Sequence, residues 1–179
     1  MKAFPQPKRG PVVLDTGPLL TYLALLYLDS IGAKKAYRDA LFWEIRGENR
    51  AFGETEQERI GFLMEASRPL LTTAPLVAEV TRLREYSGLA KAGDFRAFSL
   101  DLLAGDTFLE TTFSLAELHR EPRYMELTRR FGVTDAGLLL LADRNGGLLL
   151  TDDKPLFAAH SSESRFDIRL LDEYLREVT

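Results

Sequence analysis

Hydrophobic residues in this chain form short runs that end near acidic side chains, and the clearest example spans residues 131–156. Ala136–Ala142 is apolar on almost all sides, which predicts a buried helix. Thr134 is the predicted N-cap of this helix, so Asp135 becomes a first-turn residue, where the helix dipole favours a negative charge. Asn145, Gly146 and Gly147 follow the helix and predict its end, because Asn and Gly tolerate the left-handed conformation of a C-cap.

A buried strand is predicted directly after that helix. Leu148–Leu150 is a continuous apolar run, as expected of a central parallel strand that is covered on both faces. Thr151, Asp152 and Asp153 follow at the point where this strand would leave the sheet. Acidic residues therefore flank an otherwise apolar helix–strand unit at both ends.

Along the rest of the chain, predicted strands alternate with predicted helices. Strands are expected at residues 11–14, 69–73, 108–112, 148–150 and 166–171. Helices are expected at 19–27, 32–45, 60–66, 75–86, 93–103, 114–130 with a break near Pro122, and 172–179, while 154–160 is a helix or a loop. This alternation predicts an α/β fold, a three-layer sandwich with a central, mostly parallel sheet.

The length of 179 residues predicts one domain. Residues 1–10 are polar and predict a flexible N-terminal tail, which leaves 11–179 as a single domain. Residues 46–59 are strongly polar with two glycines and predict an exposed insertion in that domain.

The composition excludes several kinds of catalytic and metal-binding site. The chain has no cysteine, which excludes thiolate zinc sites and a cysteine nucleophile, and its two histidines cannot form a three-histidine metal site. The net charge of −4 provides no general attraction for nucleic acid. The apolar run Leu19–Leu28 is too short to span a bilayer and predicts a core helix, so we expect a cytoplasmic protein without membrane contact.

Four acidic positions, one of them a pair of adjacent aspartates, are expected at one edge of the sheet. Asp15 and the Asp152–Asp153 pair follow predicted strands, and Glu79 and Asp135 lie near the starts of predicted helices. The carboxyl ends of parallel strands are where α/β proteins place their functional crevice. Carboxylates crowded there would repel one another, and hard divalent cations relieve that repulsion. An all-carboxylate site therefore predicts Mg²⁺ or Mn²⁺ and chemistry on phosphodiesters.

Four segments in their order along the chain resemble the PIN domain, a family of small metal-dependent ribonucleases that includes the toxins of toxin–antitoxin pairs. The matching segments are VVLDTGPL at Val12–Leu19, APLVAEV at Ala74–Val80, VTDAGLLLLA at Val133–Ala142 and LLLTDDKPL at Leu148–Leu156. The resemblance covers most of the chain, and the last two segments are the most specific.

The resemblance implies roles for individual residues. Asp15, Glu79, Asp135 and Asp153 become the catalytic and metal-binding set, with Mg²⁺ or Mn²⁺ as cofactor. Thr16, Thr134 and Thr151 become hydroxyl partners that orient carboxylates, water or phosphate. Asp153 is preferred to Asp152 because the family pattern ends in Thr-x-Asp and strand alternation places Thr151 and Asp153 on one side. Asp152 remains an alternative ligand.

The implied activity is endonucleolytic cleavage of RNA that leaves 5′-phosphate and 3′-hydroxyl ends. An antitoxin protein and a second copy of the chain are candidate partners. One departure concerns length: Asp15 and Glu79 are 64 positions apart (79 − 15), more than is usual in compact toxins, and the 46–59 segment contributes much of the difference. This departure bears on toxin identity and substrate more than on the fold or the metal site.

Each acid alone also has an ordinary explanation as a turn residue or helix-start residue, and only the joint pattern favours catalysis. One alternative is a PIN-like scaffold that binds RNA or protein without cutting. Another is a phosphohydrolase of the haloacid-dehalogenase type, which would carry a second Asp two positions after Asp15, where this chain has Gly17. Asp143 is expected at the surface, His119 and His160 as surface or helix-capping residues, and the arginines between residues 120 and 130 on a solvated face.

Overall fold

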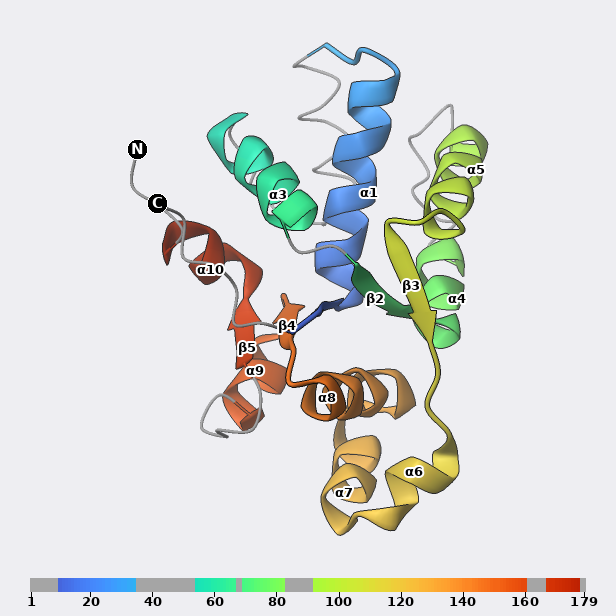
Figure 1. Ribbon diagram of the computed structural model, residues 1–179, viewed down its shortest axis with the longest axis vertical. Coiled ribbons are helices and arrows are strands. Elements are labelled where there is room, and N and C mark those ends of the chain that lie inside the picture. Colours follow the sequence, from blue (N-terminus) through green and yellow to red (C-terminus); the bar gives the residue numbers. More distant parts are fainter. Residues whose placement is uncertain (1–9, 35–53, 67–68, 83–91, 161–166, 178–179) are drawn as a thin grey trace.

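The computed structural model describes residues 10–34, 54–66, 69–82, 92–160 and 167–177 (Figure 1). Five strands form one parallel sheet: β1 (Val12–Leu14), β2 (Leu70–Thr73), β3 (Phe108–Thr111), β4 (Leu148–Thr151) and β5 (Asp167–Leu170). The strand order is β3-β2-β1-β4-β5, and all four neighbouring pairs are parallel. The α/β class and the parallel sheet predicted from the sequence are confirmed.

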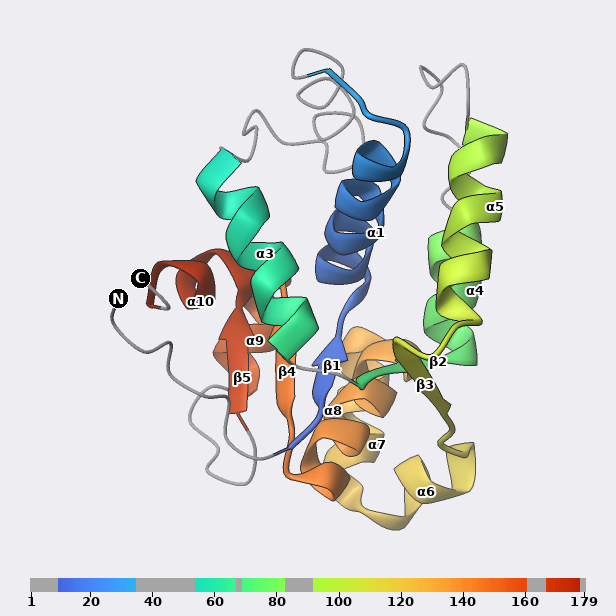
Figure 2. The ribbon, with the colours of Figure 1, turned by 45° about the horizontal axis from the view of Figure 1, so that its top comes forward.

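Helices cover both faces of this sheet (Figures 1 and 2). One side holds α1 (Thr16–Ser30), α3 (Glu54–Ala66), α4 (Ala74–Arg82) and α5 (Ala92–Leu103). The other side holds α6 (Leu115–Arg120), α7 (Pro122–Phe131) and α8 (Val133–Asn145). Near the β5 edge, α9 (Lys154–His160) and α10 (Leu171–Glu177) complete the described part of the chain.

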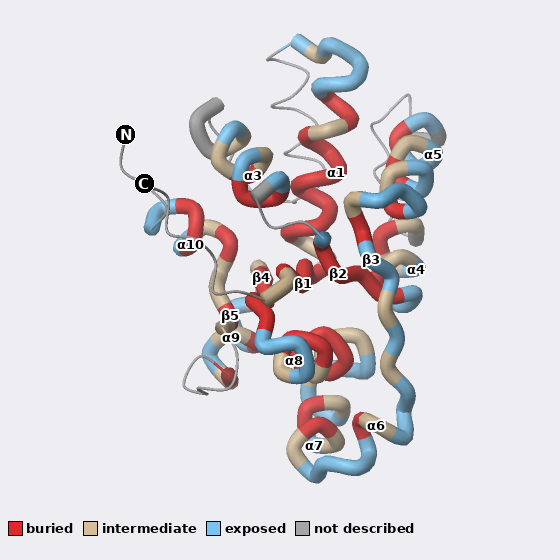
Figure 3. Tube along the Cα trace, viewed as in Figure 1, coloured by how far each residue is buried: buried red, intermediate tan, exposed pale blue. Residues whose placement is uncertain are grey.

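The core lies between the sheet and these helices (Figure 3). Strands β1, β2 and β4 are buried at every position, which is why β1 and most of β4 are apolar, while β2 is two leucines followed by two buried threonines. Helix α1 is buried along most of its length, as predicted for Leu19–Leu28. In the described ranges, every helix is too short or too polar to cross a bilayer.

Three helices that begin at the carboxyl edge of the sheet are capped by the side chain that precedes them. Asp15 accepts from Thr16 N–H at the start of α1, and Thr73 Oγ1 accepts from Leu76 N–H in α4. Asp153 Oδ1 accepts from Leu156 N–H in α9. These caps satisfy amides that a helix start leaves without partners, and they place polar side chains along one edge of the sheet.

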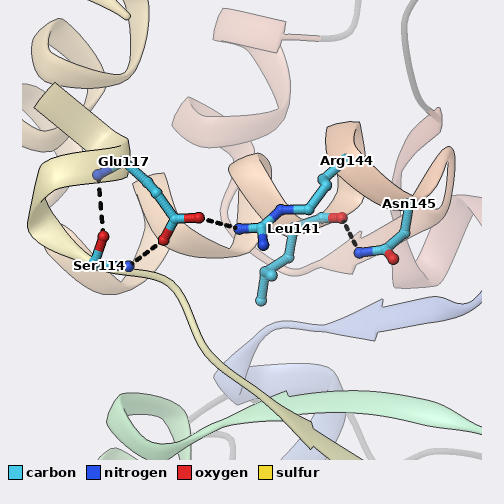
Figure 4. Close-up of polar contacts among 5 residues, drawn as sticks. All are labelled: Ser114, Glu117, Leu141, Arg144 and Asn145. Carbon is cyan, nitrogen blue, oxygen red and sulfur yellow. Dashed lines mark hydrogen bonds and ion pairs between the residues drawn. The ribbon is translucent and has the colours of Figure 1, made fainter. Parts of the chain in front are cut away.

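Helix α6 is joined to α8 by a short polar chain (Figure 4). Ser114 and Glu117 form a capping box at the start of α6, with reciprocal hydrogen bonds of 2.6 and 3.1 Å. The other Glu117 oxygen accepts from Arg144 in α8 at 3.0 Å. The predicted helical stretch 114–130 is therefore two helices, broken at Glu121 just before Pro122 as expected.

Several predicted boundaries change. Helix α1 begins three residues earlier than predicted, with Asp15 as its cap. Residues 54–59, which belong to the predicted polar insertion, form the first part of α3, because Glu and Gln favour helix. The predicted tail 1–9, the rest of the insertion and most of the predicted helix 32–45 lie outside the described residues.

Candidate metal and catalytic site

The predicted acids lie where the sheet topology changes direction. The chain builds β1, β2 and β3 outward in one direction, and then places β4 and β5 on the other side of β1. In open parallel sheets, this switch point leaves a crevice at the carboxyl ends of the two central strands. Asp15 follows β1, and Asp152 and Asp153 follow β4, so these acids border that crevice.

Asp15 is held rigidly between α1 and β4. Only 8% of the residue is exposed. Its Oδ1 accepts from Thr16 N–H at 2.6 Å, and its Oδ2 accepts from the Thr151 hydroxyl at 2.5 Å. Burial raises the pKa of Asp15 against the effect of these hydrogen bonds, and the nearby carboxylates of Asp153 and Glu79 raise it further.

Thr151 connects Asp15 to Asp153. It is fully buried at the end of β4, and its Oγ1 accepts from Asp153 N–H at 2.9 Å while its hydroxyl donates to Asp15. Asp153 is half-buried and caps α9 through one oxygen. The predicted role of Thr151 as an orienting hydroxyl therefore has a definite geometry, which fixes Asp15 relative to the Asp153 backbone.

Glu79 lies in α4, and hydroxyls from two other helices donate to its two oxygens. Thr16 Oγ1 in α1 donates to Oε2 at 2.8 Å, and Thr134 Oγ1 in α8 donates to Oε1 at 2.7 Å. The prediction that Thr134 is an N-cap is wrong. Helix α8 begins at Val133 after Gly132, which has φ 99°, so Thr134 lies inside the first turn and its hydroxyl is directed to Glu79.

Asp135 lies next to Thr134 at the start of α8. It is half-buried, and none of the hydrogen bonds among the described residues involves its carboxylate. Burial raises the pKa of Asp135 to about 7, and the charges of Asp15, Asp153 and Glu79 contribute to the increase. These electrostatic effects place the four predicted acids within interaction range of one another.

Asp152 lies on the α1 side of the crevice. A Cβ atom added at Gly17 would lie 2.5 Å from Asp152 Oδ2, so only glycine lets this carboxylate pack so closely against the first turn of α1. Asp152 is half-buried. Of the two adjacent acids, Asp153 is the one whose charge raises the pKa of both Asp15 and Asp135.

The chemistry of the donor atoms fits a metal ion, but their arrangement in this structure does not. Carboxylate and hydroxyl oxygens fit Mg²⁺ or Mn²⁺, and a cation would relieve the repulsion that raises the Asp15 and Asp135 pKa values. Nevertheless, no group of three or more Asp, Glu, His or Cys side chains in the described ranges is arranged to hold one metal ion. The oxygens of Asp15 and Glu79 each accept a hydrogen bond from a protein donor.

A separate hollow of about 330 Å³ lies over α6 and α8. It contains none of the predicted site residues and is lined by Glu117, Arg120, Glu121, Leu140, Asp143 and Arg144. Its lining carries charges of both signs, and Glu117 and Arg144 pair with each other at 3.0 Å. The hollow therefore offers less distinctive chemistry than the acids at the switch point.

Two polar residues are more buried than a surface position predicts. Asp143 is half-buried and accepts a 2.6 Å hydrogen bond from the Tyr124 hydroxyl, which joins α7 to α8. His160 is only 3% exposed and contacts the Phe131 ring edge-on. Both side chains lie under neighbouring helices whose packing is not visible in local sequence, whereas His119 is exposed as predicted.

The predictions missed one residue that supports the site. The Phe113 ring packs against Gly137 in α8, where an added Cβ would lie 2.0 Å from a ring carbon. This contact positions the turn of α8 that carries Asp135. The available signal was the glycine itself, since glycine inside an otherwise apolar helix commonly marks a close approach.

Neither models of known protein families nor curated protein sequences match the chain.

Proposed function

We propose that the chain is a Mg²⁺- or Mn²⁺-dependent endoribonuclease of the PIN type. The observation that carries the proposal is the grouping of Asp15, Glu79, Asp135 and Asp153 beside the switch point, with the pKa of Asp135 raised to about 7. Crowded carboxylates in a half-buried site are costly unless a cation offsets their repulsion. The sequence resemblance supplies RNA as the substrate class.

In this proposal, Asp15, Asp135 and Asp153 would hold the cation, with Glu79 beside them. A bound divalent ion supplies charge neutralisation and a water molecule that ionises near neutral pH. Thr16 N–H and the Thr151 hydroxyl hold the Asp15 carboxylate in one orientation. The cap that Asp153 forms on α9 restricts the Asp153 carboxylate in the same way. These four acidic side chains would repel RNA phosphates until a cation is bound.

The decisive experiment compares wild type with Asp15→Asn and Asp135→Asn on single-stranded RNA in Mn²⁺. We expect the wild type to produce 5′-phosphate ends and both variants to lose cleavage while retaining their circular dichroism spectra. Asp106→Asn is the matched control, because Asp106 is exposed and remote from the acids in sequence. Unchanged metal-dependent cleavage by both site variants would overturn the assignment.

A second function is a PIN-like scaffold that binds RNA or protein without cutting. One observation favours it: the described side chains include no group arranged to hold a metal ion. Calorimetric titration with Mn²⁺ separates the two functions. Saturable binding that is lost in Asp135→Asn supports the nuclease, and the absence of binding to wild type supports the scaffold.

An antitoxin partner, a homodimer and a cytoplasmic location are further parts of the proposal that come from the sequence alone. Co-expression with the product of an adjacent gene, followed by size-exclusion chromatography, tests both kinds of partner. A stable complex with a small DNA-binding protein would support the toxin role.

A further inference from the structure

We infer that Glu79 is a positioning residue that braces Asp15 and Asp135. This inference rests on the proposed function, because it concerns the same site.

The brace joins three helices through one carboxylate. Thr16 in α1 donates to one Glu79 oxygen at 2.8 Å, and Thr134 in α8 donates to the other at 2.7 Å. The two threonines are 63 and 55 positions from Glu79 in sequence. Helices α1 and α8 lie on opposite sides of the sheet (Figure 2), so the Glu79 carboxylate links elements from both sides.

Each threonine is the immediate neighbour of a predicted metal ligand. Thr16 follows Asp15, and Thr134 precedes Asp135. Fixing the two hydroxyls therefore fixes the backbone that carries the two aspartates. Hydrogen bonds to an ionised carboxylate are short and strong, and these two are partly buried, which limits competition from water.

The Glu79 and Asp135 carboxylates differ in their protein contacts. Both Glu79 oxygens accept from threonine hydroxyls, just as both Asp15 oxygens accept from Thr16 N–H and the Thr151 hydroxyl. Asp135, in contrast, accepts no hydrogen bond from the described residues, so its oxygens can turn to a cation without breaking one. The arrangement separates a carboxylate engaged by protein from one that is available for a ligand.

Glu79→Gln distinguishes a brace from a ligand. A threonine hydroxyl accepts as well as donates, so Gln can keep both contacts, with its carbonyl accepting from one threonine and its amide donating to the other. Gln lacks the charge that a metal-ligating carboxylate supplies. We expect Glu79→Gln to retain Mn²⁺ affinity, measured by calorimetry, and Glu79→Ala to lower it about 10- to 100-fold, as is typical for residues that orient ligands.

The threonines supply an independent test. We expect the double variant Thr16→Val/Thr134→Val to lose Mn²⁺ affinity to the same extent as Glu79→Ala, and Thr16→Ser/Thr134→Ser to restore it. Thr81→Val is the control, because Thr81 lies in the same helix with its hydroxyl bonded to the Ala78 carbonyl. If Glu79→Gln abolishes Mn²⁺ binding as fully as Asp135→Asn, or if the double valine variant binds normally, the inference is overturned.

Urea unfolding keeps the inference separate from the proposed function. A double-mutant cycle between Thr134→Val and Glu79→Ala measures whether the two side chains are coupled, without any metal or activity. Additive effects would overturn the brace even if the protein cuts RNA. Coupling together with an absence of Mn²⁺ binding to wild type would retain the brace as a structural contact but overturn the proposed function and the positioning role that rests on it.

Discussion

The Thr151 hydroxyl donates a 2.5 Å hydrogen bond to Asp15, which lies 136 positions earlier in the chain. This contact joins the ends of β4 and β1, the two strands at the switch point. It also supplies a donor to a carboxylate that is almost fully buried.

Thr151→Val should therefore destabilise the protein at neutral pH by about 1–3 kcal/mol, because a buried carboxylate loses a donor while the side-chain shape is kept. The lost hydrogen bond also raises the pKa of Asp15 further, since this bond now lowers it. Urea unfolding at pH 7.5 measures the change. Thr128→Val is the control, because that hydroxyl donates only to a carbonyl of its own helix at 2.7 Å. Equal losses in the two variants would contradict the prediction.

Asp135 should make the metal-depleted protein less stable as pH rises. Its pKa is about 7 in the folded protein and near 3.8 in the unfolded chain, so the folded state binds more protons between these values. Its contribution to stability is fully present below about pH 3.8 and is lost as pH rises through about 7. Asp135→Asn cannot ionise at this position. The melting temperature of this variant minus that of wild type should therefore increase between pH 4.5 and pH 8.

At pH 8, a divalent cation should stabilise wild type more than Asp135→Asn. If Asp135 ligates the cation, added Mn²⁺ will raise the melting temperature of wild type and leave Asp135→Asn unchanged, because a ligand stabilises only the state that binds it. Asp106→Asn should follow wild type under both conditions. A melting temperature of Asp135→Asn that tracks wild type across the whole pH range would contradict the first prediction.

Two helix glycines should respond in opposite ways to alanine. At Gly137 the new methyl group would lie 2.0 Å from the Phe113 ring, so Gly137→Ala should destabilise the protein by about 1–3 kcal/mol through overpacking. At Gly61 in α3, no atom lies within 4 Å of an added Cβ, so Gly61→Ala should stabilise by up to about 1 kcal/mol through helix propensity. Thermal unfolding of the two variants gives the comparison, and a gain at Gly137 would exclude the close packing.

Tyr124→Phe should loosen α7 from α8. The Tyr124 residue is fully buried, and its hydroxyl donates to Asp143 at 2.6 Å. Removal of the hydroxyl leaves the half-buried Asp143 carboxylate short of a donor, at a cost of about 1–3 kcal/mol. Burial, with the Asp143 contact second, raises the pKa of Tyr124, so this contribution is present below pH 10 and is lost only in strong alkali. A pH-unfolding curve of the two proteins tests both statements.

The sequence was sufficient for the elements and for the edge at which the acids lie. Strand β1 and Leu148–Leu150 of β4 are short apolar runs that are buried at every position, and runs of this kind predict a central strand. Asp15 and Asp153 follow two of these runs, so their place at the carboxyl edge follows from local pattern and the parallel connection.

What the sequence could not supply is the set of long-range partners. Thr134 has the residue type of a helix cap, and only the position of α4 across the crevice explains why its hydroxyl bonds Glu79. Asp143 and His160 are polar, which predicts a surface position or, for His160, a helix cap, but the packing of α7 buries or half-buries them. Local patterns predict the secondary structure of a segment, whereas tertiary contacts decide which of its side chains are buried and which hydrogen bonds they form.

The placement of β4 beside β1 also sets when the acids can meet during synthesis. Asp15 is made early and Asp153 comes 138 positions later (153 − 15), and no shorter segment contains all four acids. An emerging chain therefore carries an incomplete site until β4 has been made and inserted next to β1. If the protein cuts RNA, its activity is absent from nascent fragments, and the ribosome and its messenger are not exposed to a working nuclease until almost the whole sheet has formed.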